Sequence, residues 1–164
     1  QDVREIDLSS LVPYVAKPHF IPKNCVPVEQ VEGMKVDQVV VGSCSNGRIE
    51  DLQIVADILK GKHIAKNVRF IVTPASQKIY LQAVKLGVVE TLVEAGCVVT
   101  NATCGCCYGG HMGLIGAGER CLSTTTRNFK GRLGSPESEV LLCGPTTAAV
   151  SALTGVITDP RKLI

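Results

Sequence analysis

The chain has 164 residues, the size of one domain, and 45% of them are apolar while 20% are charged, so an ordinary hydrophobic core is expected. The formal net charge is only +2 and no Lys/Arg cluster is present, which excludes a typical nucleic-acid-binding surface. No apolar run approaches the roughly 18–20 residues that span a bilayer, and the polar, charged start predicts neither a membrane partner nor a signal peptide.

Residues 1–35 are interrupted by four prolines and are expected to form an irregular N-terminal extension or linker. From residue 36 onward, short Val- and Ile-rich runs alternate with segments of helical period. The predicted strands are 36–41, 68–72, 97–100, 121–124 and 140–143. The predicted helices are 49–59, 76–86, 88–95, a glycine-rich one around 109–116, and 146–154. This alternation favours one α/β domain over 36–164, with a mainly parallel sheet in a three-layer α/β/α arrangement.

Eight cysteines are the unusual feature of the composition. A chain with a full-size core and no secretion signal is expected in the cytoplasm, where thiols stay reduced. Clustered cysteines in that compartment more often bind metal or perform redox chemistry than form disulfides. Cys97, Cys121 and Cys143 fall in predicted strands and are expected to be small buried hydrophobes, whereas Cys25 carries no signal.

The first motif, Gly-Ser-Cys-Ser-Asn-Gly over 42–47, lies between the first predicted strand and the helix after it. The dipole of that helix favours the thiolate form of Cys44, and small residues leave room for a bulky group. The alternative is a tight turn with an incidental cysteine. Ser45 and Asn46 either donate hydrogen bonds to a bound group or cap the next helix.

The second motif contains Cys104 and Cys107 in Cys-x-x-Cys spacing, again after a predicted strand. This spacing brings two sulfurs within reach of one metal or cluster, although redox dithiols use it too. Cys106 is an additional thiol between them, and His111 in the following glycine-rich turn is expected to be structural.

The third motif carries Arg127 and Arg132 with a glycine between them, also after a predicted strand. Two guanidinium groups so placed can bind one carboxylate, and the alternative is a solvated basic loop. The carboxyl ends of parallel strands share one edge of a sheet, so all three motifs are expected to meet there. Together they predict a metal centre beside a carboxylate substrate. Three cysteines would leave one iron of a four-iron cluster without a protein ligand and free to act as a Lewis acid.

These residues resemble the aconitase superfamily, and in particular its large-subunit type represented by 3-isopropylmalate dehydratase and homoaconitase. The stretches that carry the resemblance are IDLSSLVPYVAKPH (6–19), VGSCSNGRIEDL (41–52), RFIVTPAS (69–76), CGCCYGGHMG (104–113), TRNFKGRLGSPE (126–137) and TGVITDP (154–160). The resemblance is to the third, C-terminal domain of that large subunit and covers nearly the whole chain. It implies the fold of that domain and a [4Fe-4S] cluster held by Cys44, Cys104 and Cys107.

The resemblance also implies that Arg127 and Arg132 hold substrate carboxylates or orient other groups of the site, with Ser45 and Asn46 beside the cluster. Two positions depart from the family pattern: Thr126 stands where the family usually has Asn, and Gly105-Cys106 stand where it often has a Pro between the cluster cysteines.

The implied activity is that of a hydro-lyase, which removes and re-adds water on a 2-hydroxy di- or tricarboxylic acid, as in leucine biosynthesis. Homoaconitase and 2,3-dimethylmalate dehydratase are the alternatives within the family. The implied partners are the N-terminal domains of the large subunit and a small subunit with a swivelling domain. The family's acid and base groups belong to those parts, so no catalytic residue is expected in this chain and the chain alone is predicted to be inactive.

Two alternatives come from other classes of protein. Cys44, Cys104, Cys106 and Cys107 could form a four-sulfur structural zinc site, although the spacing of a short zinc ribbon is absent. The other alternative is a non-catalytic electron carrier. Four cysteine ligands would suit such a protein better than three, and the paired arginines would have no role in it.

Overall fold

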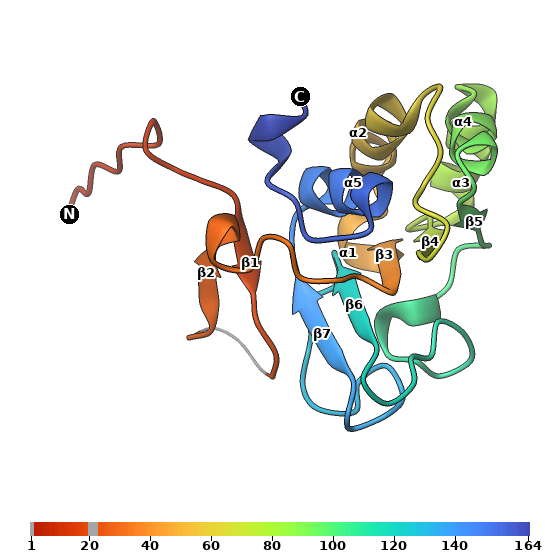
Figure 1. The fold of residues 1–164 in the computed structure, drawn as a ribbon. Helices are drawn as coiled ribbons and strands as arrows, with labels where there is room; N and C mark the ends of the chain where they lie inside the picture. Colours follow the sequence, from red (N-terminus) through yellow and green to blue (C-terminus); the bar gives the residue numbers. More distant parts are fainter. Residues whose placement is uncertain (1, 20–22) are drawn as a thin grey trace.

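A seven-stranded sheet organises the residues that the computed structural model describes, 2–19 and 23–164 (Figure 1). The strands are β1 (Tyr14–Ala16), β2 (Cys25–Pro27), β3 (Gln38–Gly42), β4 (Arg69–Thr73), β5 (Val98–Val99), β6 (Arg120–Ser123) and β7 (Glu139–Leu142). Their order is β2-β1-β7-β6-β3-β4-β5. Strands β3 to β7 are parallel, while β1 pairs antiparallel with β7 and with β2. The α/β class and the mainly parallel sheet are therefore confirmed.

The helices follow the predicted order along the chain. They are α1 (Ser43–Asn46), α2 (Ile49–Leu59), α3 (Gln77–Lys85), α4 (Val88–Glu94) and α5 (Pro145–Thr154), with 3-10 turns η1 (Val28–Gln30), η2 (Gly105–Cys107) and η3 (Pro160–Lys162). The Ser76 side chain accepts a hydrogen bond from the Ile79 N–H and so caps the start of α3. Gly87 has φ of 72°, in the left-handed region, which separates α3 from α4 as the sequence predicts.

Helices α2 to α5 all pack on one face of the sheet (Figure 1). Alternation along the strands produces this arrangement: Val39 and Val41 of β3 belong to the core beneath the helices, whereas Val40 faces the other side. The same alternation holds in β4, where Phe70 and Val72 lie under the helices. Burial of these apolar side chains, at about 25 cal/mol per Å² removed from water, is the main force holding the helices to the sheet.

Loops, rather than helices, cover the opposite face. A second, smaller core there consists of Val40, Cys106, Ile115, Cys121, Leu133 and Val140. The helix predicted around 109–116 is wrong, because turns and bends occupy this segment and an isolated bridge joins Ile115 to Gly134. Glycine weakens a helix by roughly 1 kcal/mol relative to alanine, and this segment contains four of them. The second outer layer of the predicted three-layer arrangement is therefore built from loops and η2.

The lead-in segment contributes to the same sheet. Irregular structure was expected throughout 1–35, and this is wrong for β1 and β2, although residues 1 and 20–22 lie outside the described part. Val15, Val28 and Val31 are buried in the main core. The division into an extension and a cluster-carrying domain at 35/36 stays a prediction.

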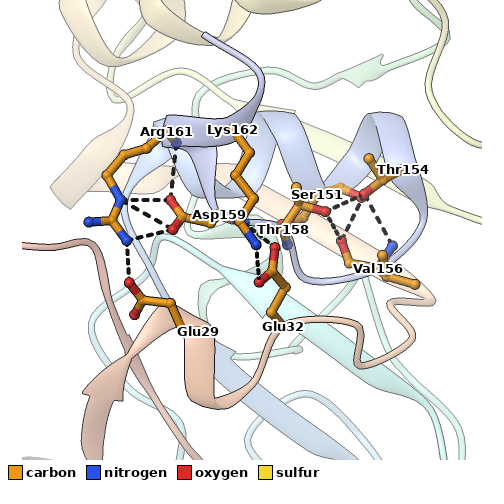
Figure 2. A network of polar contacts seen from close by, with 9 residues as sticks. All are labelled: Glu29, Glu32, Ser151, Thr154, Val156, Thr158, Asp159, Arg161 and Lys162. Atoms are coloured by element: carbon orange, nitrogen blue, oxygen red, sulfur yellow. Dashed lines mark hydrogen bonds and ion pairs between the residues drawn. The ribbon is translucent and has the colours of Figure 1, made fainter.

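A polar network fastens this lead-in to the C-terminal segment (Figure 2). Arg161 binds the buried Asp159 carboxylate with its Nε at 3.0 Å from Oδ1, and also pairs with Glu29. Lys162 Nζ lies 2.7 Å from a Glu32 oxygen. Hydrogen bonds from Arg161 lower the pKa of Asp159. The network therefore joins η1 to η3 across some 130 residues of sequence.

Within the described ranges, every helix is too short or too polar to cross a bilayer.

Candidate functional site

The sheet has a topological switch point beside its central strand. From β3 the chain proceeds to β4 and β5 on one side, and then returns to β6 and β7 on the other. In open α/β sheets, ligands bind at the carboxyl ends of the strands that flank such a point. The Cys44 motif follows β3 and the arginine motif follows β6, so these two motifs flank the switch point.

The turn that carries Cys44 has an unusual backbone. Gly42 has φ of 117°, and a Cβ at this position would lie 1.9 Å from the backbone oxygen of Thr73. Ser43 follows with φ of 64°, in the left-handed region that a non-glycine residue seldom adopts. Ser43 is buried, and its Oγ has no hydrogen-bond partner among the described residues. Strain of this kind concentrates at functional sites, and here it presents an exposed Cys44 directly after a buried strand.

Asn46 connects the Cys44 turn to the arginine motif. Its Nδ2 donates a hydrogen bond to the backbone oxygen of Thr124, the first residue after β6. In the same region, the Gly42 N–H donates to Thr124 Oγ1 at 3.1 Å. This contact differs from the helix capping considered for Asn46, and its role beside a cluster stays a prediction. The Ser45 Oγ lies 3.9 Å from Cys44 Sγ and is equally untested as a partner of a bound group.

The Cys-x-x-Cys segment forms η2, whose turn closes with a hydrogen bond of 2.8 Å from the Cys107 N–H to the Cys104 oxygen. Cys104 is exposed and Cys107 is half-buried. η2 packs against α1, the helix that contains Cys44. The exposed His111 ring lies 3.2 Å from Thr103 Oγ1, which ties the following glycine-rich turn back to the residue before Cys104.

Thr73, at the end of β4, contacts both cysteine motifs, although no sequence motif indicates it as a site residue. Its backbone oxygen lies against Gly42, and its hydroxyl would be 3.1 Å from a Cβ at Gly105. The hydroxyl also hydrogen-bonds Thr100 Oγ1 at 2.9 Å. Thr73 lies in the stretch 69–76 that carries the family resemblance, and the proline after it marks a strand end without indicating a contact.

Cys106 is buried in the smaller core, unlike the predicted ligands. It is only 1% exposed, and burial raises the pKa of its thiol to about 11. A Cβ at Gly113 would lie 2.2 Å from Cys106 Sγ, so the glycine leaves the space that this sulfur fills. Burial likewise raises the pKa of Cys97 and of Cys121 to about 12, and these two side chains are buried hydrophobes as predicted. Cys106 would have to leave the smaller core before it could bind a metal.

The two arginines of the third motif have different surroundings. Arg127 is exposed, and its Nη1 donates to the Thr126 oxygen at 3.0 Å. Arg132 is half-buried and contacts Cys107, with Nε 2.7 Å from its backbone oxygen and Nη2 3.8 Å from its Sγ. Between them, the buried Asn128 donates from Nδ2 to the oxygens of Lys17 and Val140, at 2.9 and 3.2 Å. The structure therefore joins one of the two arginines to a predicted cluster ligand.

Over residues 2–19 and 23–164, no group of three or more His, Cys, Asp or Glu side chains is arranged to hold a single metal ion. The structure thus gives no support to the four-sulfur zinc site considered from the sequence. A cubane cluster differs from a single ion because each cysteine binds a separate iron, which holds the sulfurs further apart. Two exposed thiols and one half-buried thiol, on two loops in contact, are a donor set whose chemistry fits such a cluster.

Comparison with known proteins bears on the family of the chain. A model of the aconitase family (aconitate hydratase) matches residues 26–155. Proteins named 3-isopropylmalate dehydratase large subunit are 53% identical over 162 residues in Mycolicibacterium smegmatis, 57% over 160 in Clostridium botulinum and 58% over 159 in Clostridium beijerinckii. These matches cover 97–99% of this chain but 38% of each relative. The chain spans well under half the length of these relatives, and it belongs to the aconitase family.

Proposed function

We propose that this chain is the cluster-carrying part of a [4Fe-4S] hydro-lyase of the 3-isopropylmalate dehydratase type, acting in leucine biosynthesis. The large-subunit relatives, 53–58% identical over nearly the whole chain, support this substrate class. The eight cysteines are free thiols, which supports a reducing, cytoplasmic location.

One observation carries the proposal: the three motifs are joined to one another at one edge of the sheet. Asn46 bonds the Cys44 turn to Thr124, at the start of the arginine loop. Arg132 bonds the far end of that loop to Cys107. Packing between α1 and η2 completes the ring of contacts. Topology brings the three loops to this edge, and the side-chain contacts between them support a single shared site.

In this proposal, Cys44, Cys104 and Cys107 hold the cluster as thiolates. When bound, the cluster supplies a Lewis-acidic iron without a cysteine ligand, at which a substrate hydroxyl can be polarised. Arg127 has an exposed guanidinium and binds a carboxylate of the hydroxy acid through its paired N–H groups. Ser45 and Asn46 lie next to Cys44 and orient donors toward the bound groups.

The acid and base that move the substrate's protons come from other parts of the enzyme in this proposal. The chain contains three histidines, and His111, in the turn that follows Cys107, is bonded to Thr103. The remaining domains of the large subunit and a small-subunit partner would supply these groups and close the site over the substrate. The chain by itself should bind iron and sulfide without turning over a hydroxy acid.

Anaerobic reconstitution of the chain with iron and sulfide tests the proposal. The expected product contains iron and acid-labile sulfide and absorbs broadly at about 400 nm, as thiolate-bound clusters do. Replacement of Cys44, Cys104 or Cys107 by Ala should abolish this absorbance, whereas Cys143→Ala serves as the matched control and should retain it. Stoichiometric zinc without sulfide, or an absorbance indifferent to Cys44→Ala, would refute the assignment.

A further inference from the structure

We infer that Arg132 is a positioning residue that fixes the Cys107 ligand and keeps a positive charge against its sulfur. The inference rests on the proposed function, because it concerns a cysteine assigned to the cluster. It separates the roles of the two arginines in the third motif: Arg127 faces solvent, whereas Arg132 acts through Cys107.

Two contacts from one guanidinium carry the inference. Arg132 Nε donates to the Cys107 backbone oxygen at 2.7 Å, which is the short distance expected of a charge-assisted hydrogen bond. Its Nη2 lies 3.8 Å from Cys107 Sγ, within the range of a hydrogen bond to sulfur. The first contact fixes the backbone of the ligand and the second approaches its donor atom. A guanidinium that served only the substrate would not need to bond the carbonyl of a cluster cysteine.

The surroundings of Arg132 hold it in this orientation. Its Cζ lies 5.0 Å from the centroid of the Phe129 ring, a cation–π distance that restricts the guanidinium plane. Its backbone is close to the loop it supports: a Cβ at Gly109 would lie 3.1 Å from the Arg132 oxygen and 3.0 Å from Leu133 Cα. Leu133 is fully buried in the smaller core. The backbone of Arg132 is therefore held in place, while its side chain reaches the loop that carries Cys107.

The chemistry of the side chain explains why arginine is needed here. Its planar fork can bond a carbonyl with Nε while Nη2 approaches a sulfur, and it remains charged at all physiological pH values. Lysine would keep a positive charge but could not make both contacts with fixed geometry. No described residue accepts a hydrogen bond from the third nitrogen, Nη1, so its two N–H groups are left to donate to a ligand of the assembled site.

The test compares Arg132→Lys and Arg132→Gln with the wild-type 164-residue chain after anaerobic cluster reconstitution. Iron loss to a chelator should be about tenfold faster in both variants, because the charge-assisted bond to Cys107 is lost. The reduction potential of the cluster should fall in Arg132→Gln, since a nearby positive charge no longer favours the added electron, and should stay close to wild type in Arg132→Lys. Lys85→Gln, which removes an exposed positive charge from α3 outside the three motifs, is the control and should change neither quantity.

The thermal unfolding midpoint of the metal-free variants separates two roles of Arg132. An unchanged midpoint indicates a positioning role, whereas a lower midpoint indicates general support of the fold. Unchanged potential and iron retention in Arg132→Gln would overturn the inference, whatever happens to the midpoint. If the wild-type chain takes up no iron and sulfide, the proposed function itself fails. If the wild-type chain loads a cluster and Arg132→Gln matches it, only the role of Arg132 fails.

Discussion

Gly42→Ala tests whether the backbone turn that presents Cys44 has the shape described here. An alanine Cβ at this position would lie 1.9 Å from the Thr73 backbone oxygen and 2.8 Å from its carbonyl carbon. These are backbone atoms of a paired strand, since Thr73 ends β4 opposite Gly42 of β3. They cannot move aside as the end of a flexible side chain could.

Two costs add at this position. Alanine at φ of 117° enters a sparsely populated region, which costs about 1–3 kcal/mol. Forcing an extra carbon into a packed site costs about another 1–3 kcal/mol. The free energy of unfolding should therefore fall by about 2–6 kcal/mol, a large fraction of the stability of an ordinary domain.

Gly61→Ala is the matched control. Gly61 also has positive φ, at 69°, but a Cβ there meets nothing within 4 Å. This variant should lose only the backbone cost of about 1–2 kcal/mol. Urea unfolding of both variants, followed by far-ultraviolet circular dichroism, measures the difference. Equal losses in the two variants would refute the close approach of β3 and β4 at the Cys44 turn.

Three further predictions follow from burial and polar contacts. Iodoacetamide at pH 8 should modify Cys44 far faster than Cys121, because burial raises the pKa of the latter to about 12; similar rates by mass spectrometry would contradict the burial. Stability should fall as pH rises above about 8.5, because unfolding lets the buried thiols release protons that the folded chain retains, and urea titrations across this range check the sign. Asn128→Ala should lower the free energy of unfolding by about 1–3 kcal/mol, since the Lys17 and Val140 oxygens lose a donor; an unchanged urea midpoint would speak against these bonds.

The central parallel strands β3 and β6 could be predicted because they are buried on both faces and contain short apolar runs, whereas Val98 of the edge strand β5 is 60% exposed. The run 36–41 corresponds to β3 at 38–42, and 68–72 to β4 at 69–73. β1 and β2 escaped prediction because each is only three residues long, and β1 also pairs with a strand that is distant in sequence. Ala16, for example, pairs with Leu142. The residues next to Ala16 in the sequence form no pattern that predicts this pairing.

The candidate site, too, could be predicted from the sequence only in part. Placement of the motifs at one sheet edge follows from topology, so strand–helix alternation was enough to predict it. The contacts between them do not follow from topology. The bond from Arg132 to Cys107 spans 25 residues, and that from Asn46 to Thr124 spans 78. Cys106 and Cys107 are adjacent and identical in type, yet only Cys106 packs into the smaller core, against Gly113 among others, and sequence does not show which of the two thiols is buried.

The central claim is that three thiols hold a cubane cluster with one iron open to substrate. Mössbauer spectroscopy of the chain reconstituted with iron-57 and sulfide measures this most directly. We expect one iron in four to have parameters distinct from those of the three thiolate-bound irons, and only this signal to change when a hydroxy acid is added. Four equivalent thiolate-bound irons, or a preparation that binds iron without sulfide, would contradict it.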